Sequence, residues 1–136
     1  QAQRTESAAV EAERGSLEPR RVLVVDDNQD IADGLGQLLQ TLGMETRVVY
    51  RGAAALDALA SFRPQVMLLD IGMPGMDGYE VARQVHARFP VARPKLVAVT
   101  GWGSERDRQR IRDAGFDHHL VKPVGADRLH RVLSAD

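Results

Sequence analysis

The amino-acid sequence predicts an α/β fold, a five-stranded parallel sheet doubly wound by helices in the strand order 2-1-3-4-5. Two observations support this prediction. From Arg21 onward, short apolar runs alternate with segments whose apolar residues recur at helical spacing, the pattern of a parallel sheet covered on both faces. Polar or charged residues also stand at the ends of four of the five apolar runs, where ligands bind in such sheets.

The 136 residues suit a single domain, which we expect to span residues 21–134. Residues 1–20 are rich in Ala, Glu, Arg and Gln and have few large apolar side chains, so burial cannot offset the entropy lost on ordering them. We interpret them as a flexible linker or tail. Because these residue types also favour helices, the segment could instead be the end of an upstream helix that stops at Pro19.

The expected strands are the five apolar runs. They are residues 22–25, 45–49, 66–69, 96–99 and 117–121.

The expected helices lie between and after these runs. The first is marked by leucines at helical spacing, namely Leu35, Leu38, Leu39 and Leu42. Gly43 is expected to end this helix. The others are residues 52–62, 78–88, 104–114 and 126–134. Because the helix that begins at Ser104 offers the core little besides Ile111 and Ala114, we expect it to be loosely held.

Composition excludes several kinds of protein. With 0 cysteines, the chain has no disulfide framework and no thiolate metal site. A formal net charge of -1 provides no general attraction to nucleic acid or anionic lipid. The apolar runs are too short for a spanning helix, and no signal peptide is visible. We therefore expect a cytoplasmic domain that contacts neither nucleic acid nor membrane directly, although its parent chain could be membrane-anchored.

The strand ends carry the candidate chemistry. Asp26 and Asp27 follow the first apolar run, Asp70 the third, Thr100 the fourth and Lys122 the fifth. Because the first, third and fourth strands are neighbours in the expected order, the three carboxylates should converge. At a separation of ~4 Å and an effective dielectric of about 20, each pair of like charges costs about 4 kcal/mol. Positive charge must therefore lie among them.

Lys122 provides one positive charge against three negative ones, which leaves a site suited to a hard divalent cation with oxygen ligands. We predict Mg²⁺, with Mn²⁺ as an alternative. Asp27 and Asp70 would be direct ligands, the backbone carbonyl of Gly72 a third, and Asp26 would act through a bound water.

Each of these residues also has an ordinary structural explanation. Asp26 and Asp27 could cap the first helix, and Asp70 could be a turn residue before the run Met73-Pro-Gly. The pair Lys122-Pro123 could be an ordinary turn. Only the joint placement at strand ends is specific.

The sequence also resembles a known family. The runs that carry the resemblance are Val-Leu-Val-Val-Asp26-Asp27-Asn28, Leu-Leu-Asp70-Ile-Gly-Met-Pro74-Gly-Met-Asp-Gly78, Val-Thr100-Gly101 and Lys122-Pro123. They look like the receiver domain of two-component response regulators, which has a flavodoxin-like fold. The resemblance covers nearly everything after residue 20, and the spacings also fit, since Thr100 lies 30 residues after Asp70 and Lys122 lies 22 after Thr100.

The resemblance implies a phosphorelay function. Asp70 would accept a phosphoryl group from a phosphohistidine, while Mg²⁺ and Lys122 neutralise charge on the phosphoryl oxygens. Thr100 would hydrogen-bond a phosphoryl oxygen and switch the conformation of its loop. A cis bond between Lys122 and Pro123 would aim the ammonium group. The implied partner is a histidine kinase dimerisation and phosphoacceptor domain, or a histidine phosphotransfer protein.

Three further positions, His119, Gly72 and Trp102, bear on the expected switch and on the lifetime of the phosphoryl group. His119 stands where the family often has a switching Tyr or Phe; it could couple the switch to pH near neutrality, or it could simply be half-buried. Gly72 and Trp102 resemble the family positions that flank the phosphoryl group. Trp102 could shield the acyl phosphate and slow its loss, or it could belong to a partner-binding surface.

The wider context is also an expectation. The chain ends at Asp136 directly after the last expected helix and lacks a starting Met, so we expect a receiver at the C-terminal end of a larger protein and disfavour a transcription factor. The runs Thr100-Gly-Trp-Gly and Asp117-His-His-Leu-Val-Lys-Pro most resemble hybrid sensor histidine kinases, which would make the parent chain a kinase. The domain itself would catalyse its own phosphorylation.

Three alternatives differ from this expectation. One is a stand-alone single-domain response regulator, and another is a pseudo-receiver that only binds proteins. A phosphatase of the haloacid dehalogenase type would need Asp-x-Asp on the first strand, a spacing that Asp26-Asp27-Asn28 does not provide.

Overall fold

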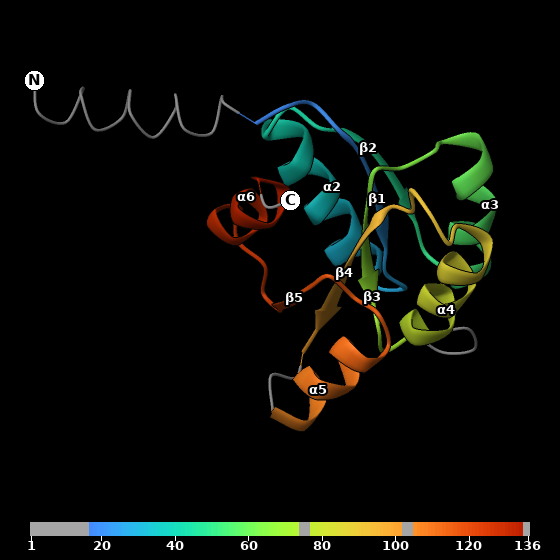
Figure 1. Ribbon diagram of the computed structural model, residues 1–136. Coiled ribbons are helices and arrows are strands. Elements are labelled where there is room, and N and C mark those ends of the chain that lie inside the picture. The colour runs from blue at the N-terminus through green and yellow to red at the C-terminus, as the bar shows by residue number, and fades with distance from the viewer. Residues whose placement is uncertain (1–16, 74–76, 102–104, 135–136) are drawn as a thin grey trace, which may run out of the picture.

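The computed structural model describes residues 17–73, 77–101 and 105–134 (Figure 1). Strands and helices alternate along the chain. They are β1 (Arg21–Val25), α2 (Gln29–Thr41), β2 (Glu45–Val49), α3 (Gly52–Ser61), β3 (Val66–Asp70), α4 (Gly78–Arg88), β4 (Lys95–Thr100), α5 (Glu105–Asp113), β5 (His118–Val121) and α6 (Ala126–Ser134).

The strands form one parallel sheet in the order β2-β1-β3-β4-β5, which confirms the predicted fold. All five carboxyl ends therefore lie at the same edge. In Figure 1 the strands begin near the top and end lower in the view. The central strands β1, β3 and β4 are apolar because both of their faces are covered by helices.

Alternate residues of the central strands point to opposite faces, so the domain has two core clusters. On one face, Leu23, Met67 and Leu69 pack with α3, α4 and α5. On the other, Val22 and Val24 pack with α2 and α6. Figure 1 shows α2 and α6 on one side of the sheet and α3 and α4 on the other.

The observed strand bounds differ slightly from the predicted ones, in ways that affect the site. β3 includes Asp70 and β4 includes Thr100, so these polar residues belong to the ordered sheet and do not merely follow it. β5 starts at His118, one residue later than predicted, and the Asp117 side chain contacts Arg93 of the loop before β4 and the Leu96 N–H of β4.

The N-cap of the first helix is neither Asp26 nor Asp27. Asn28 is the N-cap of α2, and its side chain accepts a hydrogen bond from the Ile31 N–H. The alternative that Asp26 and Asp27 merely cap this helix is therefore wrong. At the other end, Gly43 has φ of +89°, a left-handed conformation that suits glycine, and ends the helix as predicted.

The first described residues are not detached from the domain. Leu17, which lies in the predicted linker, is partly buried against the core cluster of α2 and α6. The predicted linker residues 1–16 lie outside the described residues, as does Ser104. Within the described part of the chain, no helix combines the length and apolar character that crossing a membrane requires.

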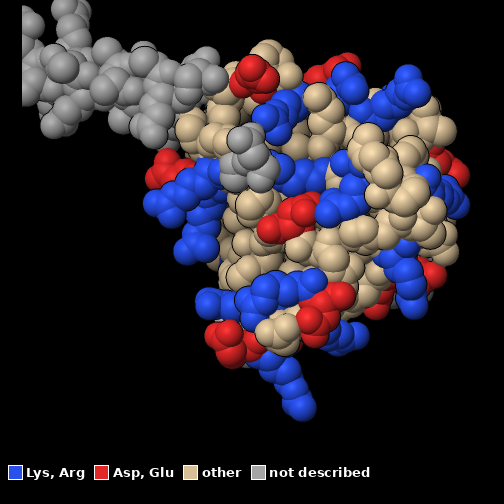
Figure 2. Space-filling view, in the orientation of Figure 1, with Lys and Arg blue, Asp and Glu red and all other residues tan. Residues whose placement is uncertain are grey.

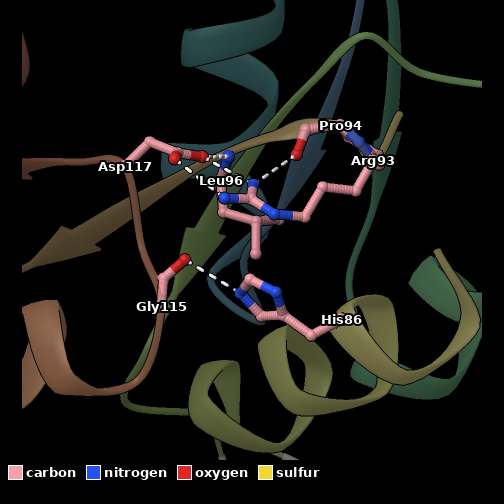
Figure 3. Close-up of polar contacts among 6 residues, drawn as sticks. All are labelled: His86, Arg93, Pro94, Leu96, Gly115 and Asp117. Carbon is pink, nitrogen blue, oxygen red and sulfur yellow. Dashed lines mark hydrogen bonds and ion pairs between the residues drawn. The ribbon is translucent and has the colours of Figure 1, made fainter. Parts of the chain in front are cut away.

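A polar clamp joins the α4–β4 loop to the start of β5 (Figure 3). The Asp117 carboxylate accepts two hydrogen bonds from the Arg93 guanidinium, at 2.7 and 2.9 Å, and one from the Leu96 N–H at 2.8 Å. Nearby, His86 Nε2 of α4 lies 3.0 Å from the Gly115 carbonyl oxygen. These contacts fix the connections on both sides of β4.

The clamp gives a prediction about stability and pH. Burial alone would raise the pKa of Asp117, but hydrogen bonds from Arg93 and the Leu96 N–H outweigh burial and lower it. We expect Asp117→Asn to reduce the free energy of unfolding at pH 7 by about 1–2 kcal/mol, a value modest because both side chains are partly exposed. Because the folded-state pKa is lowered, this stabilisation is present above the unfolded-state pKa of about 3.9 and is lost as the pH falls through the folded-state pKa.

Urea denaturation of the parent chain and Asp117→Asn between neutral and acid pH tests this prediction. Asp57→Asn is the matched control, since Asp57 is exposed on α3. A difference between the parent and Asp117→Asn that stayed constant into strong acid would contradict the proposed role of the ionised carboxylate.

Candidate functional site

Three aspartates meet at the carboxyl edge of the sheet. Asp26 follows β1 and continues its pairing, because its N–H donates to the Val49 carbonyl of β2. Asp70 ends β3, which pairs directly with β1. Asp26, Asp27 and Asp70 each offer a carboxylate oxygen, and these three oxygens all lie within 4.8 Å of one another. The structure therefore brings together the three carboxylates that the sequence predicts to converge.

Asp26 and Asp27 lie in different environments. Asp26 is 1% exposed, whereas Asp27 is exposed. Asp26 Oδ1 accepts a hydrogen bond from the Asn28 N–H, at 2.9 Å. Its Oδ2 lies 3.0 Å from Lys122 Nζ, but no hydrogen bond of acceptable geometry reaches this buried oxygen. One carboxylate oxygen is thus fixed and the other is neutralised only by a nearby charge.

Asp70 is the second buried carboxylate. Its Oδ1 accepts a hydrogen bond from the Gly72 N–H at 3.0 Å and lies 3.7 Å from Lys122 Nζ. Burial is the main cause that raises the pKa of Asp70 to about 6. The charge on Asp26 raises it further, whereas the Gly72 hydrogen bond and Lys122 lower it. Lys122 and the Gly72 N–H therefore do not offset the combined effect of burial and of the Asp26 charge on the pKa of Asp70.

Lys122 reaches the carboxylates from the end of β5. Its peptide bond with Pro123 is cis, as the resemblance implies. Its backbone N–H donates to the Thr100 carbonyl at 2.8 Å, which extends the pairing of β4 with β5. The Lys122 side chain is 23% exposed, so the ammonium group lies at the rim of the site.

Thr100 is the last residue of β4 and is 1% exposed. Since β4 pairs with β3, with Val99 opposite Asp70, Thr100 lies one residue beyond the level of Asp70 on the neighbouring strand. The structure thus brings Thr100 to the same edge as the carboxylates. The hydrogen bond to a phosphoryl oxygen stays a prediction.

Gly72 is exposed beside Asp70. Its N–H contacts Asp70 Oδ1, while the role of its carbonyl as a metal ligand stays a prediction. A Cβ at this position would lie 3.7 Å from Asp70 Oδ1. A glycine here therefore leaves the approach to the Asp70 carboxylate open.

Gly78, the first residue of α4, packs closely against the backbone of Asp70 and Ile71. A Cβ on Gly78 would lie 2.7 Å from the Asp70 carbonyl oxygen and 2.8 Å from Ile71 Cα, closer than such atoms approach. Asp77 caps the helix by accepting a hydrogen bond from the Glu80 N–H. The sequence predicts the start of a helix here but not this contact, although a glycine directly after a capping Asp is a signal of close backbone approach.

His119 lies on β5, opposite Ala98 of β4, and is half-buried. Its Nε2 is buried and makes no hydrogen bond with any described residue. Burial is the main cause that lowers the pKa of His119, and the nearby guanidinium groups of Arg108, Arg112 and Arg128 lower it further. The pKa of His119 is therefore shifted to the acid side of the near-neutral range that the sequence suggested.

Trp102 lies outside the described residues.

Two hollows differ in their relation to these side chains. One, of about 390 Å³, lies beside Lys122 and Pro123 and is lined mainly by apolar residues of α2 and the loop after β5. The other, of about 430 Å³, lies at the opposite edge of the sheet among arginines. The first hollow shares Lys122 with the site, whereas the second contains none of the site residues.

The residues fit a hard divalent cation. The three aspartates supply oxygen ligands at suitable mutual distances. Asp26 Oδ2 lacks a hydrogen bond. The pKa of Asp70 is raised mainly by burial and further by the charge on Asp26, so a nearby cation would favour the ionised carboxylate. A bound Mg²⁺ would satisfy both features. No sulfur or imidazole ligand belongs to this group of aspartates, which favours Mg²⁺ or Mn²⁺ over softer metals.

Comparison with known proteins agrees with this geometry. The family model described as response regulator receiver domain matches residues 22–134. Response regulator MprA of Mycobacterium avium is 35% identical over 109 residues, which cover 80% of this chain and 47% of that protein. MprA of Mycobacterium tuberculosis H37Rv is also 35% identical over 109 residues, 46% of its length. The chain thus spans about half the length of these relatives.

Solved structures show the same likeness. The Vibrio cholerae chemotaxis protein CheY4 has 28% sequence identity and a TM-score of 0.78, with 85% of this chain and 97% of that one covered. A putative response regulator from Chloroflexus aurantiacus has 25% identity and a TM-score of 0.77, with 87% and 100% covered. With the family match over residues 22–134 and the aspartate cluster at the expected edge of the sheet, the chain belongs to the response regulator receiver domain family.

Proposed function

We propose that this domain accepts a phosphoryl group on Asp70 and acts as a switch in a two-component phosphorelay. The observation that carries the proposal is the position of the Asp70 carboxylate, buried at a sheet edge between Lys122 and two further aspartates. Two further carboxylates at this distance would destabilise an Asp70 carboxylate that had only a structural role, because like charges repel. The same two carboxylates are needed in a site that binds a metal ion and a phosphoryl group.

The proposed step is a transfer from a phosphohistidine of the partner. An Asp70 carboxylate oxygen attacks phosphorus and forms a P–O bond, while the P–N bond breaks and its electron pair stays on the imidazole nitrogen. The Gly72 N–H holds Asp70 Oδ1, which favours the other oxygen as the nucleophile. Lys122 Nζ, 3.7 Å from Asp70 Oδ1, can pair with a phosphoryl oxygen.

The remaining site residues have supporting roles in this proposal. Asp27 and Asp70 would hold Mg²⁺ directly, with the Gly72 carbonyl, and Asp26 would act through a bound water. When bound, the ion neutralises negative charge on the phosphoryl oxygens. The Thr100 hydroxyl donates a hydrogen bond to a phosphoryl oxygen. Because Thr100 is the last residue of β4, this contact links the phosphoryl group to that strand. Asp26 also holds Lys122 in place through its 3.0 Å ion pair.

The hollow beside Lys122 supports a docking position for the partner. It is lined by apolar residues of α2, including Ile31 and Leu38, and by Pro123 and Val124. Ile31 is 36% exposed although it is a large apolar residue. A histidine kinase dimerisation and phosphoacceptor domain, or a histidine phosphotransfer protein, would place its helices here and bring phosphohistidine to Asp70. A cytoplasmic location fits this partner.

Two further roles depend on the phosphorylated state. We assign His119 the position of the switch residue on β5, where its unpartnered Nε2 could gain a hydrogen bond after a change in the Thr100 loop. We assign Trp102 the shielding of the acyl phosphate.

If Trp102 shields the acyl phosphate, Trp102→Ala should lose its phosphoryl group faster than the parent chain. An unchanged rate of phosphate loss would contradict this assignment.

The pseudo-receiver alternative predicts a defect in the acidic pair, the acceptor or the lysine. All of these residues are present, and the distances between them suit phosphoryl transfer.

The class of the longer protein to which this domain belongs depends on other observations. Two short sequence runs favour a hybrid sensor histidine kinase, whereas 35% identity over 109 residues to MprA favours a response regulator. We favour the response regulator, and a histidine kinase catalytic region in the complete gene would overturn that choice.

The proposed function predicts metal-dependent phosphoryl uptake. With Mg²⁺ and phosphoramidate, a small donor with a P–N bond, the chain should gain one phosphoryl group that hydroxylamine removes, as expected of an acyl phosphate. Excess EDTA should abolish the uptake, and Mn²⁺ should restore it. Intact mass spectrometry measures each state. Uptake that was unaffected by EDTA would contradict the role of the aspartate cluster as a metal site.

A further inference from the structure

The second hollow lies far from the aspartate cluster, where the strands begin. Its walls are the start of β1, the end of α3, the α3–β3 loop and the α4–β4 loop. Its volume is about 430 Å³, within the range of sites that bind small molecules. Its lining includes four large apolar residues, namely Leu59, Pro64, Phe89 and Pro94.

Three arginines also line the hollow, namely Arg21, Arg63 and Arg93. Arg93 is neutralised by Asp117 in the clamp described above. Within the described ranges, neither Arg21 nor Arg63 lies within ion-pairing distance of a carboxylate. In Figure 2, blue Lys and Arg groups lie close together at the upper right, at the end of the molecule where the strands begin. The hollow therefore has an excess of positive charge.

Hydrogen bonds hold the walls of the hollow in place. Arg21 Nε donates to the Arg63 carbonyl at 2.8 Å, and the Arg21 N–H donates to Gln65 Oε1 at 3.0 Å. On the facing wall, the Arg93 guanidinium donates to the Pro94 carbonyl as well as to Asp117. The site is therefore formed before any ligand arrives, which lowers the cost of binding.

The backbone of both walls is also unusual. Arg63 has φ of 53° and Ala92 has φ of 60°. Among the described residues these are the two with positive φ that are not glycine, and both line this hollow. Left-handed backbone in such residues costs free energy and concentrates at sites that bind ligands.

We infer that this hollow binds a small organic anion, a molecule with an apolar ring or short aliphatic body and one carboxylate. The body would pack on Phe89 and Leu59, and the carboxylate would pair with the guanidinium groups of Arg63 and Arg21. The planar guanidinium fork suits a carboxylate better than an ammonium group does. The inference goes beyond the phosphorelay function and requires neither Asp70 nor a metal ion.

Titration of the ¹⁵N-labelled chain with phenylacetate, followed by NMR, tests the inference. Phenylacetamide is the matched neutral probe. We expect phenylacetate to shift the backbone signals of Gln65, Ala92 and Arg93 with a dissociation constant of about 1 mM, a normal affinity for a molecule of this size. The neutral amide should bind about tenfold more weakly, because it lacks the charge-assisted hydrogen bonds. Equal binding of the two probes, or no shifts at these residues, would overturn the inference.

Variants separate this site from general charge effects. Arg63→Gln should weaken phenylacetate binding about tenfold while the backbone contact from Arg21 persists, since the Arg63 carbonyl is the acceptor. Arg131→Gln removes an exposed charge from α6, outside the lining of this hollow, and should leave binding unchanged. Asp70→Asn should also leave it unchanged, which distinguishes this site from the phosphoryl site. If acetyl-Phe-Glu-amide bound more than tenfold tighter than phenylacetate, the site would instead serve a protein segment and the small-molecule inference would be wrong.

Discussion

Asp70→Asn is expected to abolish phosphoryl uptake while leaving the domain folded. An amide cannot form the acyl phosphate, because it lacks the anionic oxygen that attacks phosphorus. The variant should be at least as stable as the parent chain in the absence of metal. The substitution removes one of three converging negative charges, and the Asn side-chain oxygen can still accept the hydrogen bond from the Gly72 N–H. Mass spectrometry after treatment with phosphoramidate and Mg²⁺, together with urea denaturation, measures both effects.

Asp57→Asn is the control for this experiment, since it removes a carboxylate from the exposed face of α3. It should take up the phosphoryl group like the parent chain. If Asp70→Asn retained substantial uptake, another residue would be the acceptor. If it failed to fold, the carboxylate would have a structural role that the three converging charges do not suggest.

Gly78→Ala is expected to damage both the fold and the site. The added Cβ would meet the Asp70 carbonyl oxygen and Ile71 Cα at 2.7 and 2.8 Å, and backbone atoms cannot move aside as a flexible side chain can. Either α4 must shift or the end of β3 must. We expect the free energy of unfolding to fall by about 2 kcal/mol, a normal cost of overpacking. Phosphoryl uptake by the folded fraction should slow about tenfold, because a small displacement of a reacting group has a large effect on rate.

Gly34→Ala is the matched control. Gly34 also lies in a helix, α2, but nothing lies within 4 Å of a Cβ at that position. Alanine should therefore stabilise the chain by about 0.5–1 kcal/mol through its helix propensity. If Gly78→Ala had the same stabilising effect as Gly34→Ala, the close packing of α4 against the end of β3 would be wrong.

The parts of the fold that could be predicted from sequence depend on local signals. Apolar runs of strand length and leucines at helical spacing are visible in a short window. The polar residues at strand ends could be predicted to meet because parallel strands all end at one edge. The distances among Asp26, Asp70 and Lys122 agree with that prediction.

Other features depend on contacts between distant segments. Arg93 and Asp117 lie 24 residues apart, and nothing in either segment selects the other as its partner. The same is true of Gly78 and Asp70, whose contact depends on how closely one helix approaches one strand. Asn28 caps α2, while Asp26 is buried beside Lys122, a residue far along the chain. The sequence could therefore predict the site residues but not the residues that support them.

The proposed function depends on Asp70 as the phosphoryl acceptor. The most direct measurement is to treat the phosphorylated chain with borohydride, which reduces an acyl phosphate to an alcohol, and to locate the altered residue by tandem mass spectrometry. We expect a single altered residue, Asp70, and we expect it only when Mg²⁺ was present during phosphorylation. Reduction at Asp26 or Asp27, or labelling that was the same without Mg²⁺, would contradict it.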